Sequence, residues 1–564
     1  MVGRFGLSFL LFIVLCNVFA VYYVSLEHYI YYWDYGVYFG WYQNYSQLLW
    51  SNPVSAVSLL FSSIYQDNYT FVFAFLLGVF SPVFGLSRLG YVLAVTNLFF
   101  IPATYALLRA FEAFIPGELL PYLKRYPFIP LSCVFFIPQF FITIVRGYAD
   151  VFGLLPLNIV YFLYFKLEPR FWDNKKLVFV GVLLAFSTIY RRYFLFWVFA
   201  FVAVMFLKEL VTGIKSGAFP SLKAHISTLK APFVGLVVLS ILLVVSTPVV
   251  FRWFQPGFAD NYAAMKFHDN YFTEFHQIQT KVGSLVFYLA ALGFIISLTY
   301  RSSRGKAVFL LFQTFLIFIM FYRFQVFDRN HMLMLLTPFV FFLSLSCLHV
   351  LSTAKTTGLK WGFASFFSIV LILNFAIVFV DGSESTISPY TMYFSSDRYR
   401  PLVRNDLDEI KRLVIYLDEN VDDDEKIYVL ASSIVLSGDI MERACKTYAV
   451  EGQKCVKYLH TFNWDLRDGF PYHFFQADYV VIPVAKDLNN IESKHKIVIL
   501  LHELFLNQNV LGVHYERLDG ESNLKQGVKV HVYRRLDDIP DKTKNQVLNR
   551  FQMFFPDNPK FKSP

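Results

Sequence analysis

One carboxylate, Asp34, stands in an unusually aromatic stretch of the chain. Residues 26–50 read LEHYIYYWDYGVYFGWYQNYSQLLW, in which Trp33 and Tyr35 flank Asp34 and Trp41 follows. A carboxylate packed among aromatic rings at a membrane surface is expected to be desolvated, which raises its pKa and makes it a better proton acceptor near neutral pH. Aromatic faces also suit stacking on sugar rings. The alternative is an interfacial aromatic belt with one solvated Asp. We interpret most of the tyrosines as such a belt, and Asp34 as functional.

Arginines, and one histidine, stand at the ends of apolar segments. Guanidinium groups are the preferred fork for phosphate oxygens. A ring of them at a membrane surface would hold a lipid phosphate whose tail lies in the bilayer. Singly, each is explained better by snorkelling or by a salt bridge, such as Arg146 with Asp150 or Arg329 with Asp328. As a set they predict a phosphate site, which comprises Arg146, Arg191, Arg192, Arg252, Arg323 and Arg329, with His331 close behind the last.

Three other groups of polar residues have weaker signals. Asp150 follows Arg146 by four residues, and it is compatible equally with a second catalytic carboxylate and with a partner for that arginine. The spacing of His268, Asp269, Glu274 and His276 matches no standard metal site, so a solvated loop is favoured and neither a metal nor another cofactor is predicted. In FNWDLRDGFPYHFF, the residues Asp465, Arg467 and Asp468 could line an acceptor cleft, but a structural loop with a Gly-Pro turn is favoured.

The elements that must position these residues are membrane helices. Of the 564 residues, 56% are hydrophobic and only 16% are charged, against roughly a quarter charged in a soluble protein. A span needs about 20 apolar residues. The shorter apolar stretch 71–84, which is broken near its end by Pro82, is expected to be a helix lying in or near the interface. About eleven spans are predicted, at 5–25, 88–110, 127–145, 151–166, 177–190, 193–210, 232–251, 283–300, 306–322, 332–350 and 361–380.

The orientation of these spans follows from the positive charges of their loops. With the N-terminus inside, 17 Lys and Arg face the cytoplasm and 9 face outward, and the first outer loop, residues 26–70, has none. An odd number of spans then places residues 382–564 outside. The net charge of +9 largely reflects this bias, and no nucleic-acid motif accompanies it. The chain is thus expected to have a membrane domain (1–381) and an outer domain (382–564).

The outer part has the pattern of a small α/β domain. Residues 407–420 and 496–506 are typical of helices, and 426–432, 478–484 and 528–535 of strands. Cys445 and Cys455 are its only cysteines, which fits a disulfide in an oxidising compartment; two free buried thiols are the alternative. No P-loop or GxGxxG occurs, so nucleotide-dependent chemistry has no support.

This pattern resembles the GT-C superfamily of glycosyltransferases, in particular the bacterial polyprenyl-phosphate-sugar enzymes related to aminoarabinose and mannosyl transferases. Asp34 matches the acid that the family has just after its first helix, and Asp150, after RGY, matches a second acid in the next outer loop. The family's basic residues for the lipid phosphate are matched loosely by Arg191, Arg192 and Arg329. Many relatives carry paired acids (DE or DxD) in the first loop, whereas Tyr35 follows Asp34 here, which favours a metal-free, monophosphate-linked donor.

The resemblance implies sugar transfer at the outer face of a bacterial inner membrane. A polyprenyl-phosphate sugar would dock its phosphate on the arginines and its sugar among Trp33, Tyr35 and Trp41. Asp34 would deprotonate an acceptor hydroxyl of an envelope glycan or glycolipid, which inverts the anomeric carbon, while the arginines stabilise the leaving phosphate. The alternative is a transporter or flippase of lipid-linked sugars, which predicts charges within the spans. The spans are nearly free of interior charge, and this favours surface chemistry over transport.

Overall fold

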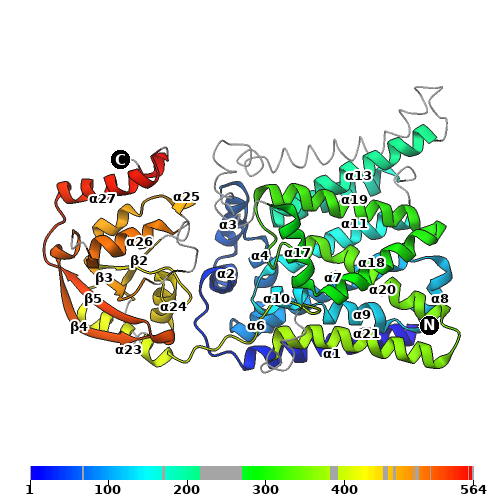
Figure 1. The fold of residues 1–564 in the computed structure, drawn as a ribbon, viewed down its shortest axis with the longest axis horizontal. Helices are drawn as coiled ribbons and strands as arrows, with labels where there is room; N and C mark the ends of the chain where they lie inside the picture. Colours follow the sequence, from blue (N-terminus) through cyan, green and yellow to red (C-terminus); the bar gives the residue numbers. More distant parts are fainter. Residues whose placement is uncertain are drawn as a thin grey trace. The chain divides into compact units, whose positions relative to one another are not determined.

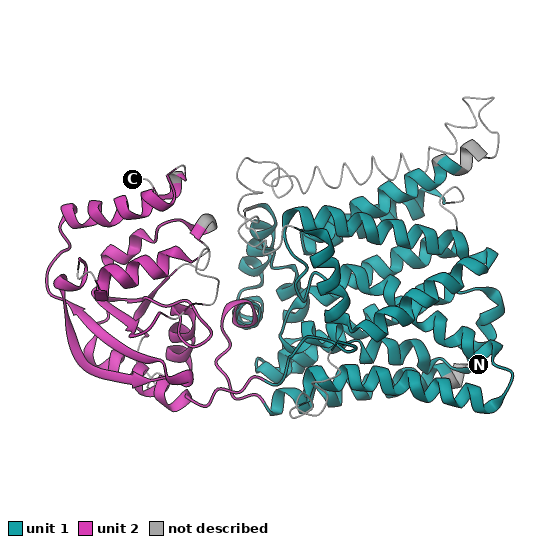
Figure 2. Cartoon of the chain, viewed as in Figure 1, with its two compact units in different colours: residues 1–26, 38–255, 266–401 teal, residues 27–37, 256–265, 402–564 magenta. Residues whose placement is uncertain are grey.

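The computed structural model describes residues 2–66, 69–167, 172–215, 270–380, 392–448, 455–461, 465–486, 488, 495–507, 510–556 and 558–561 (Figure 1). The chain divides into two compact units (Figure 2). The helical unit comprises residues 1–26, 38–255 and 266–401, and the α/β unit comprises 27–37, 256–265 and 402–564. The expected boundary at 381/382 lies outside the described residues, and the described residues 392–401 belong to the helical unit.

The first half of the helical unit alternates long apolar helices with short ones. The loop expected at 26–70 contains two helices, and the interfacial segment at 71–84 is two short helices rather than one. The elements are α1 (Val2–Ser25), α2 (Trp33–Ser51), α3 (Pro53–Gln66), α4 (Val72–Gly78), α5 (Ser81–Phe84), α6 (Arg88–Ala94), η1 (Val95–Phe100), α7 (Ile101–Phe114), η2 (Gly117–Leu119), α8 (Leu120–Arg125), α9 (Phe128–Phe136), α10 (Pro138–Val145), η3 (Ala149–Gly153) and α11 (Leu154–Lys166).

The second half of this unit contributes further long helices: α12 (Asn174–Tyr190), α13 (Phe194–Lys215), α17 (Tyr271–Val282), α18 (Ser284–Thr299), α19 (Arg301–Phe324), α20 (Leu333–Thr353) and α21 (Thr357–Phe379). Among the described residues, six helices are long and apolar enough to cross a membrane, or up to eight if each of two bent pairs counts as one span. The chain is therefore a multi-pass membrane protein, although the expected eleven spans are not confirmed as a number. The segment 232–251 lies outside the described residues.

Both bent pairs have a local cause. α9 and α10 meet at 56° where Pro138 cannot donate to the preceding turn. α17 and α18 meet at 101° at Gly283, whose φ is +99°. A Cβ at that position would lie 2.2 Å from Oδ1 of Asn374 on α21, so only glycine fits this corner.

The α/β unit is a sheet with helices on both faces. Its strand order is β2-β1-β3-β5-β4, in which β1 (Lys426–Val429) pairs in parallel with β2 (Lys457–His460) and β3 (Tyr479–Pro483). β5 (Lys529–Arg535) is antiparallel to β3 and to β4 (Tyr515–Asn523). The three expected strands are confirmed as β1, β3 and β5. The two edge strands, β2 and β4, were not expected from the sequence because edge strands bury less and lack a continuous apolar run.

Alternation along the strands divides the core of this unit into two layers. Ile427 and Val429 face α23 (Leu407–Asn420) and α24 (Gly438–Tyr448). Tyr428 faces α26 (Lys496–His502) and α27 (Asp541–Phe554) on the other side. The remaining elements are short: α25 (Asp465–Asp468), η6 (Tyr472–Gln476), η8 (Glu503–Asn507), η9 (Gly512–His514), η10 (Lys525–Gly527) and η11 (Pro559–Phe561).

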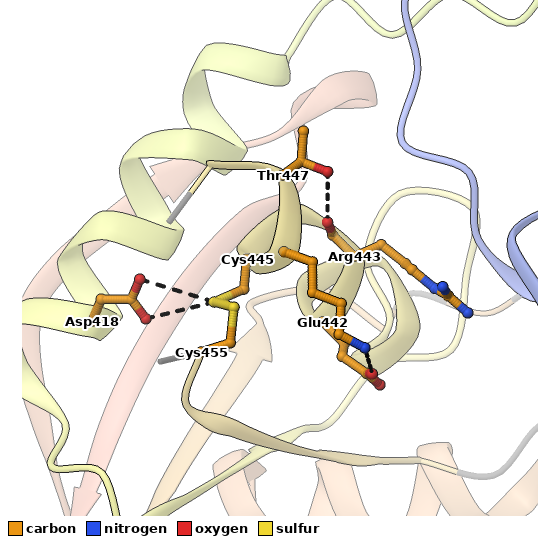
Figure 3. Close-up of a disulfide and its surroundings, with 7 residues drawn as sticks. Asp418, Glu442, Arg443, Cys445, Thr447 and Cys455 are labelled. Carbon is orange, nitrogen blue, oxygen red and sulfur yellow. Dashed lines mark hydrogen bonds and ion pairs between the residues drawn. A yellow bond between two sulfur atoms is a disulfide. The ribbon is translucent and has the colours of Figure 1, made fainter. Parts of the chain in front are cut away.

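A disulfide joins α24 to the chain before β2. The sulfur atoms of Cys445 and Cys455 are bonded (Figure 3), as expected from the sequence. The carboxylate oxygens of Asp418, on α23, lie 3.8 and 3.9 Å from Sγ of Cys445. Arg443, also on α24, extends its guanidinium group away from the disulfide (Figure 3). The disulfide thus links the last turn of α24 to the residues just before β2.

An N-terminal segment completes the α/β unit. Ile30 and Tyr32 are 4% and 2% exposed and belong to the core layer of α23 and α24. The backbone of His28 donates to Leu402 O at 2.9 Å and accepts from Arg404 N at 2.9 Å. Residues 27–37 are therefore part of a unit whose other described residues all follow residue 401.

Candidate functional site

Asp34 lies in the first turn of α2 and not in an irregular loop. Its side chain is exposed. The expectation that the flanking aromatic rings exclude water from this carboxylate is therefore wrong. The rings pack on other parts of the protein: Tyr32 is in the core of the α/β unit, and Trp33 is packed against that core. The side chain of Asp34 is therefore accessible to solvent.

The three expected stacking residues divide between the two units. Trp33 and Tyr35 belong to the α/β unit, where both rings contact Tyr32, at centroid distances of 5.0 and 6.3 Å. Trp41 belongs to the helical unit and packs in a cluster of rings with Tyr38 and Tyr69, at 5.6 and 5.9 Å. These contacts account for all three rings as structural residues, and their stacking on a sugar stays a prediction.

Asp150 forms the centre of a buried ion pair in the helical unit. Its Oδ1 accepts from Nε of Arg191 at 2.6 Å, with the two side chains 0% and 11% exposed. Asn330 donates to the same oxygen at 3.4 Å. The ion-pair partner is therefore Arg191, which follows α12, and not Arg146, the partner considered from the sequence. Oδ2 of Asp150 is buried and accepts no hydrogen bond from the described residues.

Aromatic rings enclose the guanidinium group of Arg191. Its carbon lies 5.0 Å from the ring centroid of Tyr38, 5.3 Å from that of Tyr69 and 5.9 Å from that of Tyr193. Arg192 lies over the same Tyr69 ring at 5.2 Å. Cation–π contacts of this kind hold a guanidinium group in place without neutralising it. Tyr38 comes from α2, one helical turn after Asp34.

A turn between α19 and α20 links this ion pair to a second group of cations. Asn330 contacts Asp150, and the ring of the next residue, His331, packs edge-on against Tyr193 at 5.0 Å. Burial lowers the pKa of His331 to about 4, so the imidazole is neutral at physiological pH. Its Nδ1 is buried and has no hydrogen-bond partner among the described residues. His331 can therefore bind an oxygen atom as a neutral donor, but it contributes no positive charge.

In the second group, two guanidinium groups share one ring. The carbon of Arg146 lies 5.4 Å from the centroid of Tyr399, and that of Arg329 lies 4.7 Å from it, which places the two no more than about 10 Å apart. Arg146 also donates from Nη2 to Arg400 O at 2.9 Å. Arg329 contacts Asp328 at 3.5 Å, the salt bridge considered from the sequence. Of the expected arginines, Arg191 and Arg192 thus share the ring of Tyr69, and Arg146 and Arg329 share that of Tyr399.

Two charged residues near this group, Lys281 on α17 and Asp397 after α21, were not predicted from the sequence. Nζ of Lys281 donates to Phe327 O at 2.7 Å. Asp397 accepts from Nε2 of Gln139 at 3.5 Å. Burial raises the pKa of Asp397 to about 6, although Lys281 and Arg329 act in the opposite direction. Residues 392–401 were expected in the outer domain because they follow the last apolar run. The mixture of charged residues and tyrosines in this segment is the sequence signal that could have indicated its place in the helical unit.

Other expected residues lie elsewhere or outside the described part. Arg323 is exposed on the last turn of α19. Arg252, His268 and Asp269 lie outside the described residues. No group of metal-binding side chains occurs where the chain is described, and Oε1 of Glu274 instead accepts from Phe327 N at 2.6 Å.

In the α/β unit, Asp465 has a structural role. It accepts from the backbone N–H groups of Lys496 and Ile497, at 2.5 and 3.4 Å, and so caps α26. Asp468 lies in the same short helix, α25. The side chain of Arg467 lies outside the described residues. For Asp465 the structural reading of this loop is confirmed.

The cations of the helical unit outnumber the carboxylates beside them. Helix C-termini carry partial negative charge, and Arg146 and Arg191 are the C-caps of α10 and α12, which explains part of their placement. That effect does not account for Arg329 or Lys281, nor for the buried Nδ1 of His331, which has no hydrogen-bond partner among the described residues. Such a group can bind an oxyanion through charge-assisted hydrogen bonds.

Comparisons with known proteins give a distant likeness. No family model matches the chain, and no curated protein matches its sequence. Among solved structures, it is similar to ArnT from Cupriavidus metallidurans bound to undecaprenyl phosphate, with 9% identity and a TM-score of 0.41 over 94% of this chain and 98% of that one. The apo state of ArnT gives 9% and 0.43 over 93% and 97%.

Proposed function

We propose that this protein is a glycosyltransferase that moves a sugar from a polyprenyl-phosphate donor to an envelope glycan or glycolipid, at the outer face of a bacterial inner membrane. The observation that carries the proposal is the pair of guanidinium groups, Arg146 and Arg329, on the ring of Tyr399. Arginines that are held by a ring keep their N–H groups directed for a phosphate and need little ordering on binding.

The phosphate site would stabilise the leaving group. Cleavage of the bond from the anomeric carbon to the phosphate oxygen leaves negative charge on the phosphate, where fixed cations lower the barrier most. Arg146, Arg191 and Arg329 would contact that phosphate, with Arg192 at its edge and His331 as a neutral donor. Asp150 would hold Arg191 through their 2.6 Å contact, and its role is accordingly positional.

Asp34 would act as the general base. It removes the proton of the acceptor hydroxyl, whose oxygen attacks the anomeric carbon as the phosphate departs, so that the configuration is inverted. Exposure at the first turn of α2 gives an acceptor access to this carboxylate. Tyr38, four residues later and on the same face of the helix, is one of the rings on Arg191.

Sugar transfer by the purified full-length protein tests this function. The donors would be labelled polyprenyl-phosphate sugars, including mannose and aminoarabinose, and the acceptor a total extract of envelope glycans and lipids. Asp34→Asn keeps the shape of the side chain and removes its basicity, so turnover is expected to fall by about 10²–10⁴-fold while undecaprenyl phosphate binds as before. Asp150→Asn is expected to weaken that binding instead.

Two results would contradict the proposal. Transfer at the wild-type rate by Asp34→Asn removes Asp34 as the base. Movement of lipid-linked sugar across proteoliposomes by the wild-type protein, with no glycosidic product from any donor, identifies a flippase instead. Because the test measures product and donor binding separately, a defect in the phosphate site is distinguished from a defect in the base.

A further inference from the structure

The beginning of α2, which carries Asp34, is held by α24 of the α/β unit. The backbone N–H of Trp33, the first residue of α2, donates to Oδ2 of Asp439. The first N–H groups of a helix have no acceptor within that helix. Asp439, in the first turn of α24, provides one from a different element, and the contact fixes the residue immediately before Asp34.

The turn at this place is strained and tightly packed. Trp33 has a φ of +47°, a left-handed conformation that is unfavourable for a residue with a Cβ. Such a conformation persists only where the surroundings fix it. Here Tyr32 is buried in the core on one side, and on the other a Cβ at Gly36 would lie only 2.3 Å from Tyr31 O.

A second residue of α24 orients the carboxylate of Asp439. Nε of Arg443, one helical turn further on, lies 3.4 Å from its Oδ1. The two side chains are 26% and 15% exposed, and Nε of Arg443 lies 3.6 Å from the point that a Cβ of Gly36 would occupy. Arg443 therefore lies beside the first turn of α2 and holds Asp439 so that Oδ2 meets the N–H of Trp33.

We propose that Asp439 is a positioning residue for Asp34, and that the α/β unit acts in catalysis by fixing the first turn of α2 through it. The inference rests on the proposed function, in which Asp34 is the base. Asp439 touches neither donor nor acceptor. A base displaced by about 1 Å from its productive place loses about 10²-fold in rate, so that fixing this turn affects turnover and leaves donor binding alone.

The test combines hydrogen exchange and steady-state transfer in the full-length protein. In Asp439→Ala the amides of residues 33–37 are expected to lose protection, and kcat to fall by about 10–100-fold with an unchanged KM for the donor. Asp439→Asn retains an acceptor oxygen for Trp33, so it should restore both the protection and most of kcat. Glu442→Gln, in the same helix but paired with Lys446 and His460, is the matched control and should resemble the wild type.

Each outcome decides one claim. If the amides of residues 33–37 keep wild-type protection in Asp439→Ala, the inference is overturned. It is also overturned if this protection is lost and kcat stays at the wild-type value. If Asp439→Ala does not fold, Arg443→Gln replaces it: lower kcat at constant KM supports the inference, and unchanged kcat overturns it. If the wild-type protein transfers no sugar, the proposed function fails, and exchange alone then decides whether Asp439 holds the turn.

Discussion

At the scale of single residues, the structure assigns the arginines different local environments. Arg191 has a buried carboxylate partner and three rings around it. Arg146 and Arg329 share the ring of Tyr399, and Arg329 also contacts Asp328. A cation whose charge is matched by Asp150 is better suited to fixing geometry. We assign the phosphate contact to the pair on Tyr399, since two guanidinium groups on one ring can bind one phosphate together.

The first prediction concerns that pair. Arg146→Ala and Arg329→Ala should each weaken binding of undecaprenyl phosphate by about 10–100-fold, since a charge-assisted hydrogen bond contributes about 1.5–3 kcal/mol. Arg304→Ala, at the opposite end of α19 from Arg329, is the control. Binding is measured on detergent-solubilised protein at fixed ionic strength. Equal affinity in all four proteins would remove Tyr399 and its neighbours from the phosphate site.

At the scale of elements, the cap of α26 makes the stability of the α/β unit depend on pH. Burial raises the pKa of Asp465 to about 7, although the backbone N–H groups of Lys496 and Ile497 act to lower it. The folded protein then binds a proton that the unfolded chain releases near pH 4. The stabilisation that this proton gives the folded unit is fully present below the pKa of Asp465 in the unfolded chain, and it is lost as the pH rises towards 7.

The second prediction follows from this sign. Protection factors of the α26 amides, corrected for intrinsic exchange, should fall between pH 5 and pH 8 in the wild-type protein. Asp465→Asn keeps an oxygen for the cap and cannot ionise, so its protection should change little over the same range and exceed that of the wild type at pH 8. Parallel profiles for the two proteins would show that Asp465 does not titrate in this range.

Elements that depend on local pattern could be predicted from sequence, and elements that depend on distant partners could not. The apolar runs that became α1, α19, α20 and α21 were found because length and hydropathy suffice for a span. The exposure of Asp34 was not predicted from the rings that flank it in sequence. The residue before it, Trp33, is bonded to Asp439, which is 406 residues away in sequence. The partnership of Asp150 with Arg191 was missed for the same reason.

At the scale of the whole molecule, the orientation in the membrane is open to a direct test. The loop charges predict that the N-terminus lies in the cytoplasm and the α/β unit outside. A reporter fusion after Lys230 should report the cytoplasm, and one after Pro564 the outer compartment. Non-reducing peptide maps should also show Cys445 linked to Cys455, as expected of an oxidising compartment. A cytoplasmic C-terminus with free thiols would place the α/β unit on the wrong side for the proposed reaction.

The incorporation of residues 27–37 into the α/β unit has a consequence in time. Synthesis runs at about 5–20 residues per second, so the ribosome needs roughly 20–80 s to pass from Trp33 to Asp439, a separation of 406 residues. Throughout that interval Ile30 and Tyr32 have no core to enter. The contact between Trp33 and Asp439 can form only after residue 439 has been made, so a prematurely terminated chain inserts its first helices before the turn that carries Asp34 is fixed.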